Sequence, residues 1–338
     1  MSVLIRPRSL SFNLEPTFRC NLTCEMCPRF SSQDPQLDMS MKTYERIREA
    51  MDYAHTVDFT GWGEPMLHPS IYRMVRMARQ KGCVTTMTSN GTLLNQRNSL
   101  ALIDAGMQRL TISVDGLTPQ TFEAIRVGAS FQKVTENLRR LTKLVETRHG
   151  VLELGIAFTL QESNAPELER IVPWMSSVGA TVLHLKHLNV ISNRTDWAKS
   201  FLKYKLEPLT ENTDRLRRLE ERLFELRREA EESGVRVLTH SELPLRSERR
   251  GRHCLATPLE SVYFSFQGEM APCCHFGHHV SRYFDGRDYP PDSLFFGDIR
   301  SQDFLEVWNA PDFREFRRGF REETFPQACR SCYLLYGK

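Results

Sequence analysis

The sequence predicts an α/β protein, built as a partial (β/α)6 barrel of the TIM type and followed by a small cysteine-rich domain. Strand-like segments alternate with helical segments six times between residues 9 and 185, with short turns between them. Such alternation is typical of a parallel sheet covered by helices. Residues 254–338 instead combine five cysteines with glycine, proline and aromatic residues. Six units are two fewer than a complete barrel has, so we expect a barrel that stays open.

The individual elements follow from the spacing of apolar residues, which alternate along a strand and recur every three to four residues in a helix. The predicted strands are Ser9–Leu14, Val57–Thr60, Val84–Thr88, Arg109–Val114, Leu152–Leu160 and Thr181–Leu185. The predicted helices are Met41–Ala54, Ile71–Gln80, Leu100–Ala105, Phe131–Thr147 and Ala165–Val178. Ser40 suits the N-cap of the first helix, and Gly82 suits the end of the second.

Beyond residue 193 the pattern changes. Residues 210–233 are strongly charged, with leucines at helical spacing at positions 216, 219, 223 and 226, which predicts a surface helix docking one leucine stripe. One more strand, Val235–Thr239, is expected to follow. We therefore divide the chain into a barrel (1–195), a helical linker (196–245) and a cysteine-rich domain (246–338). The last has few aliphatic runs, so we expect a metal cluster to supply part of its stability.

Composition narrows the class of protein. The 338 residues are 40% hydrophobic and 26% charged, an ordinary globular profile. No apolar run approaches the ~20 residues of a membrane span, and residues 1–8 lack a signal segment. We therefore expect a cytoplasmic protein, in which clustered cysteines are metal ligands rather than disulfides. The net charge of +3 is too small to indicate nucleic acid.

Three cysteines, Cys20, Cys24 and Cys27, follow the first strand at C-x3-C-x2-C spacing. Thiolates are preferred ligands of iron–sulfur clusters, and three of them leave one iron of a cubane open. Structural zinc normally takes four protein ligands. The spacing resembles that of the radical S-adenosylmethionine (SAM) superfamily. The resemblance implies a 4Fe–4S cluster whose open iron chelates the amino and carboxylate groups of SAM.

Further motifs stand at the ends of successive strands, where ligands bind in such folds. Gly63 and Glu64 resemble the family's "GGE" motif, whose backbone meets the SAM amino group. Ser89 and Asn90 end the next strand, where they are placed to meet ribose hydroxyls.

The following strand supplies Ser113, and Arg126 lies thirteen residues beyond it. They resemble the family pair that contacts ribose and the SAM carboxylate, for which arginine is a natural clamp. Met26 stands where many relatives place an aromatic residue near adenine. A thioether can also pack on a purine.

A second cysteine set consists of Cys254, Cys273, Cys329 and Cys332. Its spacing resembles a SPASM-type auxiliary domain in the shortened "twitch" form, which implies one auxiliary 4Fe–4S cluster. Four thiolates are also a common zinc site, so that alternative stays open. The Gly268-x4-Cys spacing selects Cys273 as ligand. Its neighbour Cys274 is left over, and we expect a non-ligating thiol able to return a hydrogen atom to a substrate radical. The alternatives are that Cys274 is a buried bystander or is itself the ligand.

The resemblance implies that an electron donor such as flavodoxin or ferredoxin reduces the first cluster, and that a 5′-deoxyadenosyl radical then abstracts hydrogen from a substrate C–H bond. Fewer than ten residues precede the first strand, too few for a leader-binding domain. We therefore expect a small-molecule substrate, such as a sugar, aminocyclitol or natural-product intermediate, and a net oxidation or epimerisation. A peptide or protein substrate is one alternative, and a non-catalytic zinc-binding interaction module is another. His184 and Lys186 end the sixth strand, where they are either ordinary polar residues of a strand end or polar groups that line a substrate pocket.

Overall fold

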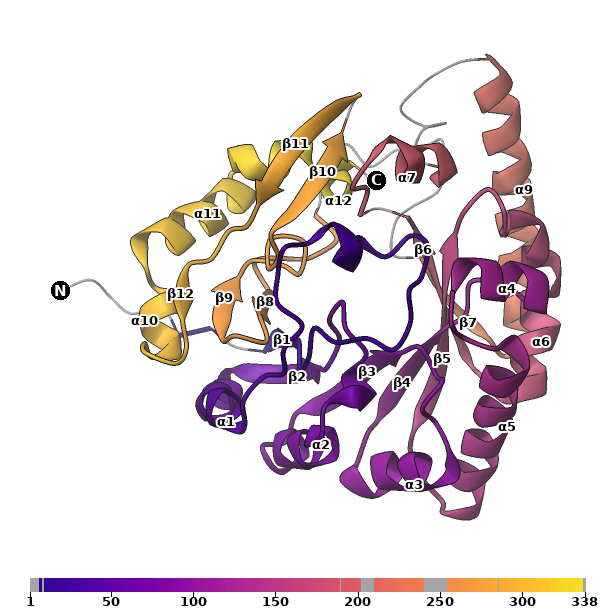
Figure 1. Cartoon of the computed structure of the whole chain (residues 1–338), viewed down its shortest axis with the longest axis horizontal. Helices are drawn as coiled ribbons and strands as arrows, with labels where there is room; N and C mark the ends of the chain where they lie inside the picture. Colours follow the sequence, from indigo (N-terminus) through magenta and orange to yellow (C-terminus); the bar gives the residue numbers. More distant parts are fainter. Residues whose placement is uncertain are drawn as a thin grey trace.

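A curved ten-stranded sheet runs through the molecule in the order β12-β9-β8-β1-β2-β3-β4-β5-β6-β7 (Figure 1). The computed structural model describes residues 6–7, 9–188, 190–201, 210–239, 254–284 and 286–336. The first seven strands are β1 (Leu10–Leu14), β2 (Ala54–Asp58), β3 (Val84–Ser89), β4 (Arg109–Ser113), β5 (Glu153–Leu160), β6 (Val182–His187) and β7 (Arg236–Thr239). All seven are parallel to their neighbours, which confirms the predicted α/β partial barrel.

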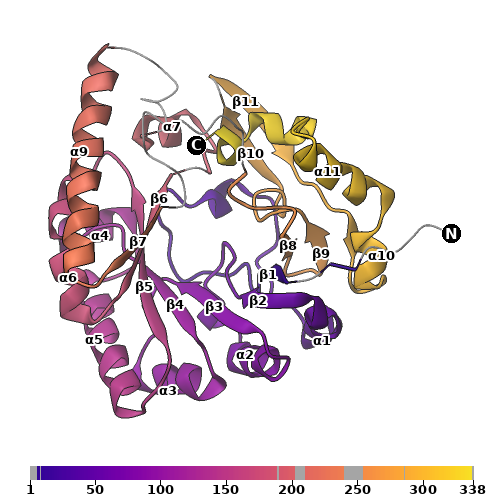
Figure 2. The same ribbon diagram turned by 180° about the vertical axis from the view of Figure 1, so that it is seen from behind.

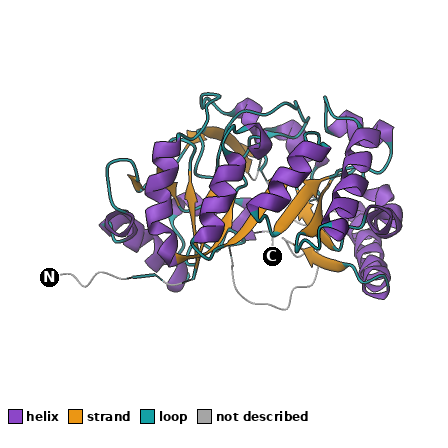
Figure 3. Ribbon diagram, turned by 90° about the horizontal axis from the view of Figure 1, so that it is seen from below, coloured by secondary structure: helices purple, strands orange, loops and turns teal. Residues whose placement is uncertain are grey.

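Helices cover the outer face of this sheet, side by side (Figure 3). They are α1 (Met41–Glu49), α2 (Ile71–Gln80), α3 (Gln96–Ala105), α4 (Pro119–Ile125), α5 (Phe131–Thr147) and α6 (Ile171–Val178). Short 3-10 turns lie at Pro28–Ser31, Ala50–Tyr53, Pro65–Leu67 and Ala165–Arg170. Helices α2 and α5 have the predicted bounds, and Ser40 caps α1 by accepting a hydrogen bond from Thr43 N.

Four helices differ from the prediction. Helix α1 ends at Glu49, and a 3-10 turn at Ala50–Tyr53 follows it before β2 begins at Ala54. Helix α3 starts four residues early because the side chain of Asn95 caps it. Helix α4 was not predicted, although Thr118 caps it and Pro119 opens it, a favourable combination. The helix predicted over 165–178 is a 3-10 turn followed by α6, because Pro173 is tolerated only in the first turn of an α-helix.

The charged segment after the barrel forms α7 (Arg194–Lys199) and α9 (Thr210–Glu232). Leu216, Leu219, Leu223 and Leu226 of α9 are all buried, which confirms the predicted leucine stripe. Helix α9 stands beside α6 and β7 at one end of the molecule (Figure 2), and β7 extends the parallel sheet as expected. The predicted boundary at 245 lies outside the described residues, so the three-part division remains a proposal.

The C-terminal segment attaches to the other edge of the sheet. Its strands are β8 (Ser261–Phe264), β9 (Glu269–Ala271), β12 (Gly297–Asp298) and the separate hairpin β10 (Val280–Phe284) and β11 (Arg287–Asp292). Strand β8 pairs in parallel with β1. Three helices, α10 (Phe304–Trp308), α11 (Pro311–Arg321) and α12 (Tyr333–Tyr336), and a 3-10 turn at Gln327–Ser331 complete the segment.

This segment has an aromatic core that the expectation of a weak core overlooked. Phe296 and Phe313 stack with ring centroids 4.2 Å apart, and Trp308 meets Phe313 edge-on at 5.4 Å. Aromatic side chains bury large areas. A prediction based on aliphatic runs alone therefore underestimated how well this segment packs. No helix among the described residues is long and apolar enough to cross a bilayer.

Candidate active site

The loop carrying Cys20, Cys24 and Cys27 leaves β1 and lies within the arc of the sheet in the view of Figure 1. Thr23 N donates to Val127 O at 3.0 Å, and Glu25 N donates to Ile125 O, at the end of α4, at 2.9 Å. All three thiols line one cavity of about 270 Å³. Burial raises the pKa of Cys20, and that of Cys24 to about 11. These thiols therefore need a strong positive centre to become thiolates, which an iron–sulfur cluster would provide.

Every residue predicted around this first cluster lines the same cavity. Besides the three cysteines these are Met26, Gly63, Glu64, Ser89, Asn90, Ser113 and Arg126. They come from the cysteine loop, from the ends of β2, β3 and β4, and from the end of α4. The fold thus brings together seven positions that the sequence scatters over a hundred residues.

Gly63 allows the loop after β2 to approach the cysteine loop closely. A Cβ atom at this position would lie 2.1 Å from Thr17 O and 2.7 Å from Arg19 O. The neighbouring hydrogen bond from Glu64 N to Arg19 O measures 2.8 Å. Glycine at position 63 therefore lets the two loops pack closely next to Cys20, in addition to any contact with a ligand.

Glu64 is a buried carboxylate whose oxygens are occupied by neighbouring groups. One oxygen accepts from Ser89 Oγ at 2.8 Å and from Met66 N at 3.1 Å, and the other accepts from Asn90 N at 2.7 Å. Burial raises its pKa, while these hydrogen bonds stabilise the charge. Glu64 thus ties the end of β3 to the loop after β2. Asn90 in turn donates to Asn21 Oδ1 at 2.9 Å, within the cysteine loop.

Arg126 is held in place by Asp115, a fully buried residue that follows β4. Its Nε and Nη2 atoms lie 2.7 and 2.5 Å from Asp115 Oδ2. The other oxygen of Asp115 accepts from Thr159 N at 2.6 Å. Sequence reasoning named Arg126 but missed Asp115 as its partner. The signal was present, since an aspartate directly after a strand is placed to orient a cation at the strand ends.

Met26 belongs to an apolar wall of the cavity. It packs in one buried cluster with Leu22, Ile125 and Leu188, and its exposed fraction is 9%. This wall keeps water from one side of the cavity and suits a flat apolar ring.

The second cysteine set also converges. The electrostatic neighbours of Cys273 include Cys254 and Cys332 besides the adjacent Cys274, and those of Cys329 include the same two thiols. Burial raises the pKa of Cys273 and of Cys329. The four thiols fit a shared cluster that would hold them as thiolates. Among the described residues, no three metal-ligating side chains are grouped closely enough for a single ion.

Cys274 faces different surroundings from Cys273. Its charged neighbours are Glu15, Lys186 and Asp58, which lie at the ends of β1, β6 and β2. Burial raises its pKa to about 12. The chain is not extended here, because Cys273 lies in a bend, Cys274 begins a turn, and Phe276 N donates to Cys273 O at 3.2 Å. The charged neighbours of the two thiols differ nevertheless.

A second cavity, of about 460 Å³, runs along the inner face of the sheet. Its lining includes Asp58, Thr111 and His184, and both Thr88 and Lys186 line this cavity and the first. Burial lowers the pKa of Lys186, while the nearby carboxylate of Asp58 opposes that shift. His184 lies in the middle of β6, and the cavity extends back to Glu153 and Val182, the first residues of β5 and β6. The second cavity therefore runs along the strands, and of the two residues predicted at the strand end only Lys186 also lines the first cavity.

A buried polar network joins the barrel to the C-terminal segment, and sequence reasoning missed it. Tyr263 OH lies 2.8 Å from Glu15 Oε2 and 2.9 Å from His278 Nε2, and His278 Nδ1 lies 2.9 Å from Asp34 Oδ2. The ring of His278 stacks on Trp62, which lines the first cavity, with centroids 4.1 Å apart. Burial opposes the charge on His278, but the two carboxylates outweigh it and raise its pKa to about 9.

Comparison with known proteins places this geometry in a family. The radical SAM superfamily model matches residues 14–156, and the SPASM model of an iron–sulfur cluster-binding domain matches residues 254–333. These spans contain all seven of the cysteines predicted to bind iron.

Individual relatives match over nearly the whole chain. The tungsten-containing aldehyde ferredoxin oxidoreductase cofactor-modifying protein of Pyrococcus furiosus is 24% identical, covering 95% of this chain and 86% of its own. The PqqA peptide cyclase of Granulibacter bethesdensis is also 24% identical, covering 98% and 81%. In fold, the chain is similar to SuiB of Streptococcus suis, whose crystal structure holds the precursor peptide SuiA. The TM-score is 0.69 at 17% identity, covering 98% of this chain and 71% of SuiB. The chain belongs to the radical SAM superfamily and carries a SPASM iron–sulfur domain, with a 4Fe–4S cluster, SAM and auxiliary iron–sulfur as its cofactors.

Proposed function

We propose that Cys20, Cys24 and Cys27 hold the SAM-cleaving cluster, and that the substrate enters the cavity on the inner face of the sheet. When bound, the reduced cluster and SAM supply a 5′-deoxyadenosyl radical, which takes a hydrogen atom from a C–H bond. The observation that carries this proposal is the meeting of the two cavities at Lys186. A substrate in the second cavity would present its carbon directly beside the first.

The protein's own groups position SAM in this arrangement. Arg126, oriented by Asp115, is placed to clamp the SAM carboxylate. Ser89, Asn90 and Ser113 supply polar groups for ribose, and the wall around Met26 receives adenine. Because Glu64 and Asp115 fix these side chains in advance, little ordering is left for the binding step.

Replacing Cys20, Cys24 and Cys27 together by alanine tests the assignment. The variant should fold, shown by an unchanged far-UV circular dichroism spectrum, and should form no 5′-deoxyadenosine from SAM under dithionite. Cys83→Ala is the matched control, because Cys83 is buried behind the sheet away from both cavities. Normal SAM cleavage by the triple variant would end the assignment.

For the substrate, relatives favour a peptide or protein over the free small molecule expected from the sequence. The support comes from the PqqA peptide cyclase, which matches 98% of this chain. A cavity of about 460 Å³ accommodates one or two amino-acid side chains. A cofactor precursor is the second candidate, supported by the Pyrococcus relative. The zinc-binding module loses its basis, because both cysteine sets lie in iron–sulfur domains.

Extract stimulation separates the two substrate classes. SAM cleavage by the purified enzyme should increase when cell extract is added. If the substrate is a peptide, protease treatment of the extract should abolish the increase. An increase that survives proteolysis and passes a small-pore filter would favour the cofactor precursor.

We also propose that Cys274 returns hydrogen to the substrate radical. Donation of its S–H hydrogen atom leaves a thiyl radical, which needs one electron from the external reductant and one proton from solvent to become a thiol again. The outcome would be epimerisation. Without that donation, the substrate radical would lose a proton to solvent and one electron to the auxiliary iron–sulfur that the SPASM domain implies, which gives net oxidation.

A further inference from the structure

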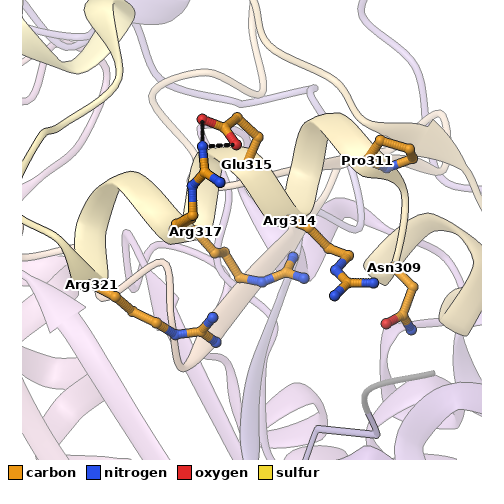
Figure 4. Close-up of a pocket in the computed structure, with 7 residues that line it drawn as sticks. Asn309, Pro311, Arg314, Glu315, Arg317 and Arg321 are labelled. Carbon is orange, nitrogen blue, oxygen red and sulfur yellow. Dashed lines mark hydrogen bonds and ion pairs between the residues drawn. The ribbon is translucent and has the colours of Figure 1, made fainter. Parts of the chain in front are cut away.

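A cavity of about 530 Å³ lies on α11, apart from both cavities of the candidate active site. Its lining includes Asn309, Glu315 and the four arginines Arg314, Arg317, Arg318 and Arg321. The guanidinium groups of Arg314, Arg317 and Arg321 lie on one side of the helix, and the carboxylate of Glu315 lies on the other (Figure 4). The spacing i, i+3 and i+7 along the helix brings them onto one face.

Arg317 is buried, with 2% of its surface exposed. Its guanidinium lies 3.8 Å from the ring centre of Trp308 and 4.3 Å from that of Phe313. Nη2 donates to Trp308 O at 2.5 Å, whereas the buried Nη1 has no hydrogen-bond partner among the described residues. A buried guanidinium without a counter-charge is costly. Burial and the charges of Arg321 and Arg314 lower its pKa to about 10.

The neighbouring carboxylates do not neutralise this group. Glu315 pairs with Arg318 at 2.7 Å, and Glu322 lies 3.9 Å from the same guanidinium. Across the described part of the chain, no ion pair involves Arg314, Arg317 or Arg321. Three positive charges therefore converge on a concave site whose lining carboxylate, that of Glu315, is paired with Arg318 instead.

We propose that this cavity binds a phosphate group, either free or carried by a small organic molecule. Guanidinium forks match the oxygens of phosphate in pairs, and a dianion balances two of the three charges. The free Nη1 of Arg317 supplies the inner donor, and Arg314 and Arg321 supply the outer ones. A concave site of this size favours a small ligand over the broad, flatter contact of an acidic protein.

Calorimetric titration of the anaerobically purified full chain with sodium phosphate tests the proposal. Arg317 also donates a hydrogen bond to the Trp308 carbonyl, so replacing it would affect both folding and binding. The exposed residues Arg314 and Arg321 are therefore replaced instead. Arg314→Gln and Arg321→Gln should each weaken phosphate binding about tenfold or more, the effect of losing a charge-assisted pair. Arg227→Gln, the same change at an exposed position on α9, should leave the dissociation constant unchanged. All three should cleave SAM normally, which shows that they are folded.

The same titration also distinguishes between ligand sources and includes outcomes that would contradict the proposal. Tighter binding of glucose 6-phosphate than of phosphate would point to an organic phosphate, and equal or weaker binding to the free ion. The proposal fails if the wild-type chain gives no phosphate heat. It also fails if Arg227→Gln weakens binding as much as the cavity variants do. Binding of a glutamate-rich peptide without binding of phosphate would replace it with an acidic partner. None of these outcomes depends on the identity of the radical reaction.

Discussion

Single residues at the first cavity are fixed by protein partners before any ligand arrives. Asp115 holds Arg126, and Glu64 holds Ser89 and the backbone of Asn90. Sequence could identify the ligand-facing members, because cysteine spacing and strand-end position are local signals. It could not identify Asp115 as the partner of Arg126, since this contact depends on how α4 packs in three dimensions against the end of β4.

At this scale the clearest prediction concerns Cys274→Ala. Its charged neighbours are the inner-face residues Glu15, Lys186 and Asp58, so the variant should keep its iron and still cleave SAM, but should not form an epimerised product. Iron analysis and product analysis together check this. In the wild type, solvent deuterium should enter the product. Lost iron would make Cys274 a ligand, and unchanged product would make it a bystander.

His278 predicts a pH dependence of stability. Its pKa is about 9 in the folded chain and about 6.5 when unfolded. The stabilisation is therefore complete below about pH 6.5 and is lost as pH rises through 9, by an amount on the order of 3 kcal/mol. Denaturant unfolding from pH 6 to 9.5 should show this loss in the wild type. His278→Gln, which keeps a polar side chain near Tyr263, should show a flatter profile. Parallel profiles would mean that the imidazolium contributes nothing.

Among the elements, the loops that follow the strands contain most residues of the candidate site, and the strands hold these loops in place. Sequence periodicity predicted β1 to β6 and most helices, since apolar spacing reports directly on burial. It failed at α11, where three phenylalanines and arginines at positions 314, 317, 318 and 321 obscure the usual aliphatic pattern. It also could not show that β8 joins β1, because strand pairing across the chain leaves no local signal.

The close approach of two loops predicts that Gly63→Ala damages the cluster site. The new methyl group would overlap Thr17 O and Arg19 O, so the backbone next to Cys20 must move, at a cost of about 1–3 kcal/mol. Iron content and SAM cleavage should both fall. Gly150→Ala is the control, because the nearest atoms to its Cβ lie at an ordinary 3.6 Å. Equal behaviour of the two variants would show that the loop adjusts freely.

The whole molecule combines two cysteine sets, one in the loop after β1 and the other in the C-terminal segment. If each set holds one cubane, the reconstituted chain should contain about eight irons. The Cys20, Cys24 and Cys27 triple variant should retain about four, held by the auxiliary set, and Cys329→Ala with Cys332→Ala should lose that auxiliary share. Metal analysis by mass spectrometry checks all three. Four irons and one zinc in the wild type would instead assign zinc to the C-terminal set, and about twelve irons would indicate a second auxiliary cluster.

The pairing of β1 with β8 has a consequence for how the chain folds. Tyr263 OH meets Glu15 across a separation of 248 residues, so the first strand receives its second neighbour only after most of the protein has left the ribosome. Until then β1 is an open sheet edge, and such edges are prone to pair with other chains. Contacts of this sequence separation slow folding. The loop with Cys20, Cys24 and Cys27 therefore remains uncovered during synthesis, which leaves time for iron to be delivered before the C-terminal segment closes over it.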